Sequence, residues 1–65
     1  DALTAADRAA ALAPRNVDVL DTLAEVHFRI GNAAKAVEVE SRAVTIDPKS
    51  EYLKDQIERF KRGDR

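Results

Sequence analysis

Acidic and basic side chains recur at helical spacing in one stretch of the sequence. The row, with steps of three and four residues, consists of Asp18, Asp21, Glu25 and Arg29. Residues at this spacing share one face of a helix. Two carboxylates can work as general acid and base when an apolar pocket separates their pKa values, but this row has no such pocket around it. We therefore expect no catalysis here: the row is either an ordinary solvated face or a charged surface for a partner.

The chain has a single histidine, His27, and no cysteine. One histidine cannot complete a zinc site, and the missing cysteines exclude thiolate ligands. Catalytic histidines also need an oriented partner, and no serine or cysteine nucleophile pattern surrounds His27. We expect His27 to pack on an apolar helix face, with mild pH sensitivity as the functional alternative. No metal and no cofactor is expected.

Glu40 lies among small and branched apolar residues at helical spacing. A carboxylate in such surroundings must find a partner or reach water. One interpretation is that Glu40 contacts a ligand or determines which ligand binds. The other, which we favour, is an ion pair with Lys54 or Lys61, or a side chain that extends to solvent. We predict that the carboxylate is solvent-accessible or within reach of one of these lysines.

Prolines and glycines divide the chain into four predicted helices. Pro14 and Pro48 cannot continue a helix, and Gly31 is a natural C-terminal cap. Asn16 and Ser50 are favourable N-caps for the segments that follow them. The predicted helices span residues 1–13, 17–30, 33–46 and 51–61. Because the connections are short, neighbouring helices should pack antiparallel, which predicts an all-α fold of helical hairpins.

Apolar residues occupy one face of each predicted helix. In the second helix they are Leu20, Leu23, Ala24, His27 and Ile30, and in the third Ala36, Val37, Val39, Ala43, Val44 and Ile46. Ala24 and Ala36 are small, so the two backbones can approach closely where these helices cross. The last helix has a narrow apolar stripe of Leu53, Ile57 and Phe60 between charged residues.

The spacing of these residues resembles the tetratricopeptide repeat. That repeat runs Trp-x-x-Leu-Gly-x-x-Tyr, then Ala-x-x-x-Phe, then Pro, with a period of about 34 residues. The matching positions here are Leu20, Leu23, Ala24, His27, Ala36, Glu40, Ala43 and Pro48. Residues 1–16 also align with residues 35–50, which places Pro14 on Pro48. The resemblance therefore covers nearly the whole chain, with His27 in place of the Tyr and Glu40 in place of the Phe of the repeat.

The resemblance implies a tetratricopeptide-like α-solenoid. Residues 1–16 would form the second helix of a partial repeat, residues 17–50 a complete repeat, and residues 51–65 a C-terminal capping helix and tail. Glu58 replaces the small residue that a further repeat needs, so we expect the array to end here. The first helix lacks its mate, and we expect a second copy of the chain or upstream residues to cover its small-residue face. That face consists of Ala2, Ala6, Ala9 and Ala13.

The resemblance also implies a protein-interaction module with no enzymatic activity. In this family, residues of the first helix line a concave groove that holds an extended peptide. The matching residues here are Asp18, Asp21, Glu25, Phe28 and Arg29. Such a groove is mostly acidic, which suits a basic protein or peptide. We expect charge reversal at Asp21 and Glu25 to weaken a basic ligand and leave folding almost unchanged, because exposed charges contribute little to stability.

The composition of the chain argues against some of the remaining functions. The net charge of −1 argues against binding to nucleic acid, and no apolar run is long enough to span a membrane. The chain does not begin with Met, so we expect a processed or excised piece of a longer protein. The alternative to an interaction module is a structural or oligomerisation appendage of a larger enzyme. A catalytic domain upstream in the parent protein would favour that alternative, and further repeats would favour a scaffold.

Overall fold

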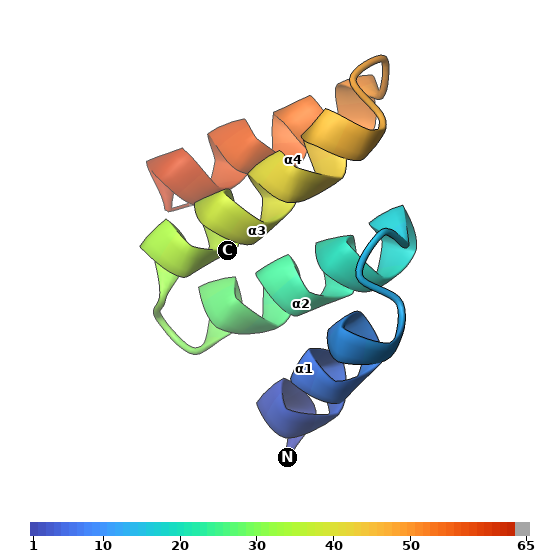
Figure 1. The fold of residues 1–65 in the computed structure, drawn as a ribbon. Coiled ribbons are helices and arrows are strands. Elements are labelled where there is room, and N and C mark those ends of the chain that lie inside the picture. Colours follow the sequence, from blue (N-terminus) through green and yellow to red (C-terminus); the bar gives the residue numbers. More distant parts are fainter. Residues whose placement is uncertain (64–65) are drawn as a thin grey trace.

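The computed structural model describes residues 1–63, which form four helices and no strand (Figure 1). The helices are α1 (Ala2–Leu12), α2 (Val17–Arg29), α3 (Ala33–Ile46) and α4 (Glu51–Arg62). The predicted all-α fold is confirmed. Each predicted helix end lies within one residue of the observed end. The last two residues of the predicted tail lie outside the described part of the chain.

Side chains cap the start of every helix. The Asn16 side-chain oxygen accepts a hydrogen bond from the backbone N–H of Val19 at 3.1 Å, and Ser50 caps α4 in the same way. Asp1 and Asn32 cap α1 and α3, although the sequence analysis did not single them out as caps. Each cap satisfies one of the N–H groups that a helix start leaves without an intrahelical partner.

Glycine ends two of the helical segments. Gly31 follows α2 with a φ of 91°, and Gly63 caps α4 with a φ of 77°. Both values lie in the left-handed region, which glycine adopts without steric penalty. The first of these turns reverses the chain, so that α3 runs back along α2 (Figure 1).

Each helix packs against the next one in the chain, so α2 lies between α1 and α3, and α4 packs on α3 (Figure 1). The fully buried apolar residues come from the predicted faces of α2 and α3: Leu20, Ala24, Ala36, Val39 and Ala43. Leu53 and Phe60 add the buried stripe of α4. Small residues therefore occupy the core of the α2–α3 pair, as the sequence predicted.

One predicted core residue lies at the surface. Ile30 is 59% exposed because α2 ends at Arg29, and Ile30 belongs to the turn that precedes Gly31. Its place in the core is taken by Phe28, which is almost completely buried. The helix therefore ends one residue before the end of the apolar face predicted for it.

The small-residue face of α1 is only partly covered. Ala6 is buried, Ala9 and Ala13 are half-buried, and Ala2 is exposed. Leu12, at the end of the same helix, is 82% exposed. Packing on α2 therefore covers part of this face.

Close packing between α2 and α3 predicts a strong effect of added volume. Ala36→Leu should lower the free energy of unfolding by about 1–3 kcal/mol, because three carbon atoms must fit into a filled core. Ala34→Leu, at an exposed position of the same helix, is the matched control and should change stability little. Urea unfolding followed by circular dichroism measures both. Equal stability of the two variants would contradict the packing described here.

Candidate functional site

An open groove of about 400 Å³ lies between the start of α1, one face of α2 and α4. Its lining consists of Ala2, Asp21, Thr22, Glu25, Val26, Arg29, Ile30, Tyr52 and Gln56. Three of the five predicted groove residues are therefore together: Asp21, Glu25 and Arg29. Ile30 and Tyr52 provide exposed apolar surface beside these charged groups.

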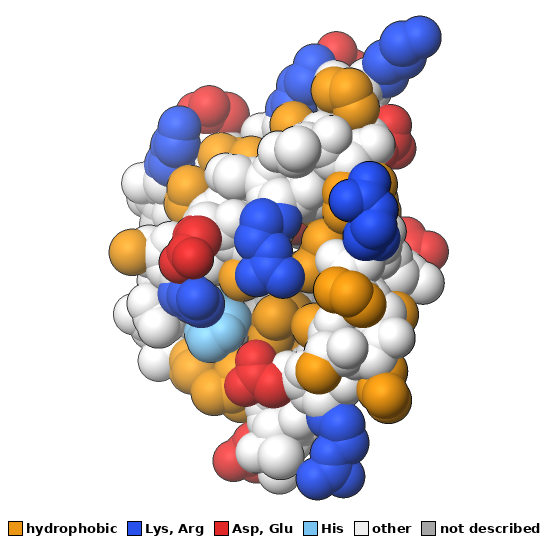
Figure 2. Space-filling model, viewed as in Figure 1, with side chains coloured by type: hydrophobic (Ala, Val, Ile, Leu, Met, Phe, Trp, Pro, Cys, Tyr) orange, Lys and Arg blue, Asp and Glu red, His pale blue; other side chains and the backbone are white. Residues whose placement is uncertain are grey.

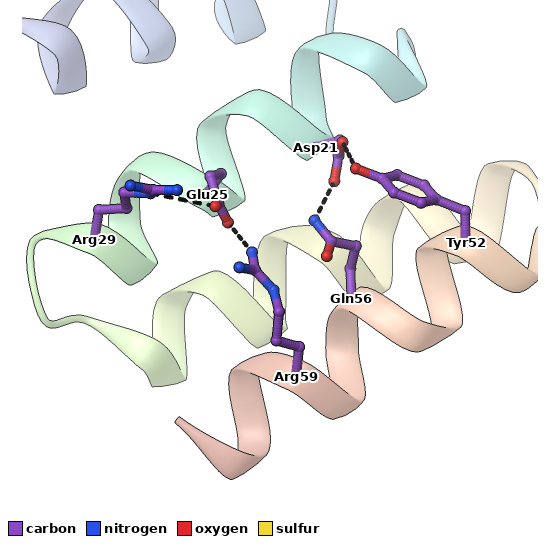
Figure 3. Close-up of polar contacts among 6 residues, drawn as sticks. All are labelled: Asp21, Glu25, Arg29, Tyr52, Gln56 and Arg59. Atoms are coloured by element: carbon purple, nitrogen blue, oxygen red, sulfur yellow. Dashed lines mark hydrogen bonds and ion pairs between the residues drawn. The ribbon is translucent and has the colours of Figure 1, made fainter. Parts of the chain in front are cut away.

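Asp21 links α2 to α4 through both of its carboxylate oxygens (Figure 3). The Tyr52 hydroxyl donates a hydrogen bond to one oxygen at 3.0 Å, and the Gln56 amide donates to the other at 3.5 Å. Because Tyr52 donates its proton to a negatively charged acceptor, the pKa of Tyr52 is raised above its ordinary value.

Glu25, one turn further along α2, binds two arginines (Figure 3). Arg29 donates from its Nε to one carboxylate oxygen at 3.3 Å, within the same helix. Arg59 of α4 forms an ion pair with the other oxygen. The second contact joins helices that are far apart in sequence, and it lies at a partly buried position.

These contacts overturn one expectation about Asp21 and Glu25. Both residues were expected to be exposed, so that charge reversal would leave folding almost unchanged. They are instead half-buried and hold α4 against α2. Charge reversal at both positions would place cations against Arg59, so it should destabilise the docking of α4.

Three residues of α4 complete the site, and the sequence analysis did not single them out as part of it. Tyr52, Gln56 and Arg59 follow each other at steps of four and three residues, beside the apolar stripe of the same helix. That spacing is the signal that could have identified them, since it forms a polar row facing α2.

Phe28 does not line the groove. Its ring packs on the ring of Phe60, with centroids 4.8 Å apart and planes tilted by 36°. The Arg59 guanidinium lies 5.2 Å from the Phe28 centroid and 5.0 Å from that of Phe60, within the range of cation–π attraction. Phe28 therefore belongs to the core that positions Arg59.

Asp18 also lies outside the groove. It borders a smaller recess of about 180 Å³ between α1 and α2, together with Ala6, Ala9, Val19 and Thr22. The predicted row of charges is therefore divided. Its first member faces α1, and the other three face the groove.

Glu40 contradicts the prediction made for it. Its side chain is 0% exposed, and the structure gives it no ion pair with either predicted lysine within residues 1–63. Lys54 lies 4.0 Å from Glu51 of its own helix instead. The face of α3 that carries Glu40 is covered from both sides, by α2 and by α4, so the side chain cannot extend to water.

Burial raises the pKa of Glu40 from its ordinary 4.5 to about 9. Asp21 and Glu25 add to this effect through their negative charges, and Arg59 opposes it. As a carboxylate, Glu40 has no hydrogen-bond donor for either oxygen. As a neutral acid it can donate its proton to Asp21. Glu40 therefore keeps its proton at neutral pH.

His27 is buried on α2, as its place on the apolar face predicted. Its Nδ1 atom is enclosed and has no hydrogen-bond partner. Within residues 1–63 no three His, Cys, Asp or Glu side chains converge in a way that could hold a metal ion. No helix in this part of the chain is long and apolar enough to cross a membrane.

Comparison with known proteins finds no match. No family model, no curated protein and no solved structure matches this sequence.

Proposed function

We propose that this chain is a protein-interaction module of tetratricopeptide-like architecture that binds an extended peptide and has no chemistry of its own. The proposal is supported by the all-α hairpin arrangement and by the repeat-like spacing of the sequence. In this scheme α2 and α3 form one repeat, and α4 occupies the position of the first helix of a following repeat. A surface formed by successive first helices is where stacked helical repeats present a concave binding face.

The open groove between α1, α2 and α4 is the observation that carries the proposal. Ile30 and Tyr52 are 59% and 58% exposed, and they offer apolar surface to the stem of a long side chain. Asp21 and Glu25 face the same space. A carboxylate has about four lone-pair sites, so each can accept a further hydrogen bond from a ligand. Lysine and arginine combine an apolar stem with a cationic end, so we propose a basic peptide as the ligand.

Arg29 provides the sharpest test, because it lines the groove and its side chain is 71% exposed. Arg29→Glu should strengthen the binding of a basic peptide about tenfold at low salt, since the charge of the groove changes by two units. A fluorescent peptide with alternating lysines, titrated by anisotropy, measures this change. The same peptide with glutamates in place of the lysines should bind more weakly to the variant than to the unmodified chain.

Arg8→Glu is the matched control, because it makes the same charge change at an exposed position of α1 outside the groove. Its effect on affinity should be several times smaller and should disappear at higher salt, where long-range attraction is screened. Equal effects of the two substitutions would contradict binding in the groove. No measurable binding of any peptide would overturn the proposed function.

For the exposed part of α1 we propose a second copy of the chain as partner. Leu12 and Ala2 remain uncovered at the two ends of this helix. A two-fold contact is the commonest form of association between identical chains. Sedimentation equilibrium should therefore show a dimer at high concentration, and Leu12→Lys should shift it toward monomer. A monomer at all concentrations, with α1 protected from hydrogen exchange, would show that this helix needs no partner.

A further inference from the structure

Arg59 and Glu40 each have a buried polar group without a hydrogen-bond partner. In Arg59 this group is Nε, and in Glu40 it is both carboxyl oxygens. The other side of the Arg59 guanidinium is bound to Glu25 through Nη2. We propose that Glu25 and Glu40 compete for Arg59, and that the proton carried by Glu40 decides which of the two binds it. The competition involves only residues of this chain, so it does not depend on whether a peptide binds in the groove.

The charges around Glu40 come from two neighbouring helices. Asp21 and Glu25 face it from α2, and Arg59 and the phenol of Tyr52 face it from α4. Arg59 is the one cation among these groups, whereas three carboxyl groups share the junction. One arginine cannot neutralise three carboxylates in a buried site, and like charges in such a site prevent simultaneous ionisation. Arg29 also contacts Glu25, but its side chain is 71% exposed. A proton on Glu40 therefore takes the place of a second buried cation.

The position of Arg59 then depends on the state of Glu40. When Glu40 is neutral, it offers no charge to Arg59, and Arg59 binds Glu25. When Glu40 loses its proton, a buried carboxylate without a donor is left beside an unpaired Nε, and the guanidinium is drawn toward it. The guanidinium rests on the rings of Phe28 and Phe60, which hold it between α2 and α4.

This exchange changes the charge that the groove presents. Glu25 lines the groove, whereas Glu40 does not. When Arg59 turns to Glu40, Glu25 keeps only its contact with the exposed Arg29. The groove then becomes more acidic as the pH rises, through the proton of a residue that never touches a ligand. Glu40 is therefore a positioning residue for Glu25.

Nuclear magnetic resonance can follow all partners in the intact chain. With ¹³C-labelled carboxyl groups and ¹⁵N-labelled arginine, the Glu40 carboxyl should titrate above pH 7. The Glu25 carboxyl and the Arg59 Nε signals should shift with the same midpoint. In Glu40→Gln, which cannot ionise, both signals should stay constant through that range. Glu38→Gln, at an exposed position of α3, should preserve the wild-type behaviour.

The unmodified chain alone can overturn the proposal. A Glu40 carboxyl that titrates below pH 6 would do so, and so would Glu25 and Arg59 signals that ignore the Glu40 transition. Arg59→Gln provides a second check, because the loss of the cation should shift the Glu40 midpoint upward. An unchanged midpoint in that variant would show that Arg59 does not act on Glu40. The tyrosine ring carbon reports Tyr52 separately, so its ionisation cannot be mistaken for that of Glu40.

Discussion

Glu40→Gln is expected to stabilise the chain at pH 7 by about 3 kcal/mol. In the folded chain Glu40 stays protonated at pH 7, whereas in the unfolded chain it ionises above its ordinary pKa of 4.5. The stability contributed by this proton is complete below pH 4.5 and falls by about 1.4 kcal/mol per pH unit above it. It is lost by about pH 9, where the folded chain also ionises. Glutamine has a similar shape and never ionises, so the loss does not occur in the variant.

Urea unfolding of both proteins between pH 5 and pH 9 measures this difference. The gain in stability should be small at pH 5, grow with pH and level off near pH 9. Glu38→Gln removes an acid from an exposed position of the same helix and should change stability by less than about 0.5 kcal/mol. A variant that is less stable than the unmodified chain at pH 7, or a difference that does not vary with pH, would show that Glu40 is ionised or solvated. We expect Glu40→Leu to be neutral or stabilising for the same reason.

Phe60→Ala is expected to have the largest destabilising effect, about 3–5 kcal/mol. The ring is almost completely buried, and it packs on Phe28 and beneath the Arg59 guanidinium. The loss is comparable to the total stability of a chain this small, since stability is about 0.05–0.15 kcal/mol per residue. The variant should therefore release α4 or unfold at room temperature.

Hydrogen exchange separates these two outcomes, because release of α4 alone would leave α2 and α3 protected. Lys61→Ala is the control on the neighbouring exposed position and should change neither exchange nor stability appreciably. Retention of α4 protection in Phe60→Ala would contradict the proposed role of this ring in holding the helix.

Local signals in the sequence predicted the helices well. Pro14, Pro48 and Gly31 interrupt helices through their own backbone restrictions or freedom, whatever the rest of the fold does. Asn16 and Ser50 act on backbone groups only three residues away. Because these effects act within short segments, the ends of the helices can be predicted without knowing how the helices pack.

The candidate site was less predictable, because it depends on contacts between distant helices. Asp21 and Glu25 fall on the charged face of α2, and only the position of α4 converts that face into a partly buried junction. Glu40 was assigned to solvent or to a lysine for a similar reason. The helical spacing of Glu40 did not determine what its side chain would contact. In the structure α2 and α4 together cover it and exclude water. Phe28 was expected in the groove but lies in the core. Its partner, Phe60, lies 32 residues away in the chain, so the sequence around Phe28 does not reveal this contact.

The proposed function is tested most directly by titrating the ¹⁵N-labelled chain with an unlabelled basic peptide and following the backbone amide signals. Binding in the groove should shift the amides of Asp21, Glu25, Arg29, Ile30, Tyr52 and Gln56 in a saturable way, with little change along the exposed face of α3. Spectra that do not change with the peptide, or saturable shifts that map to α3 and leave the groove unaffected, would contradict the account.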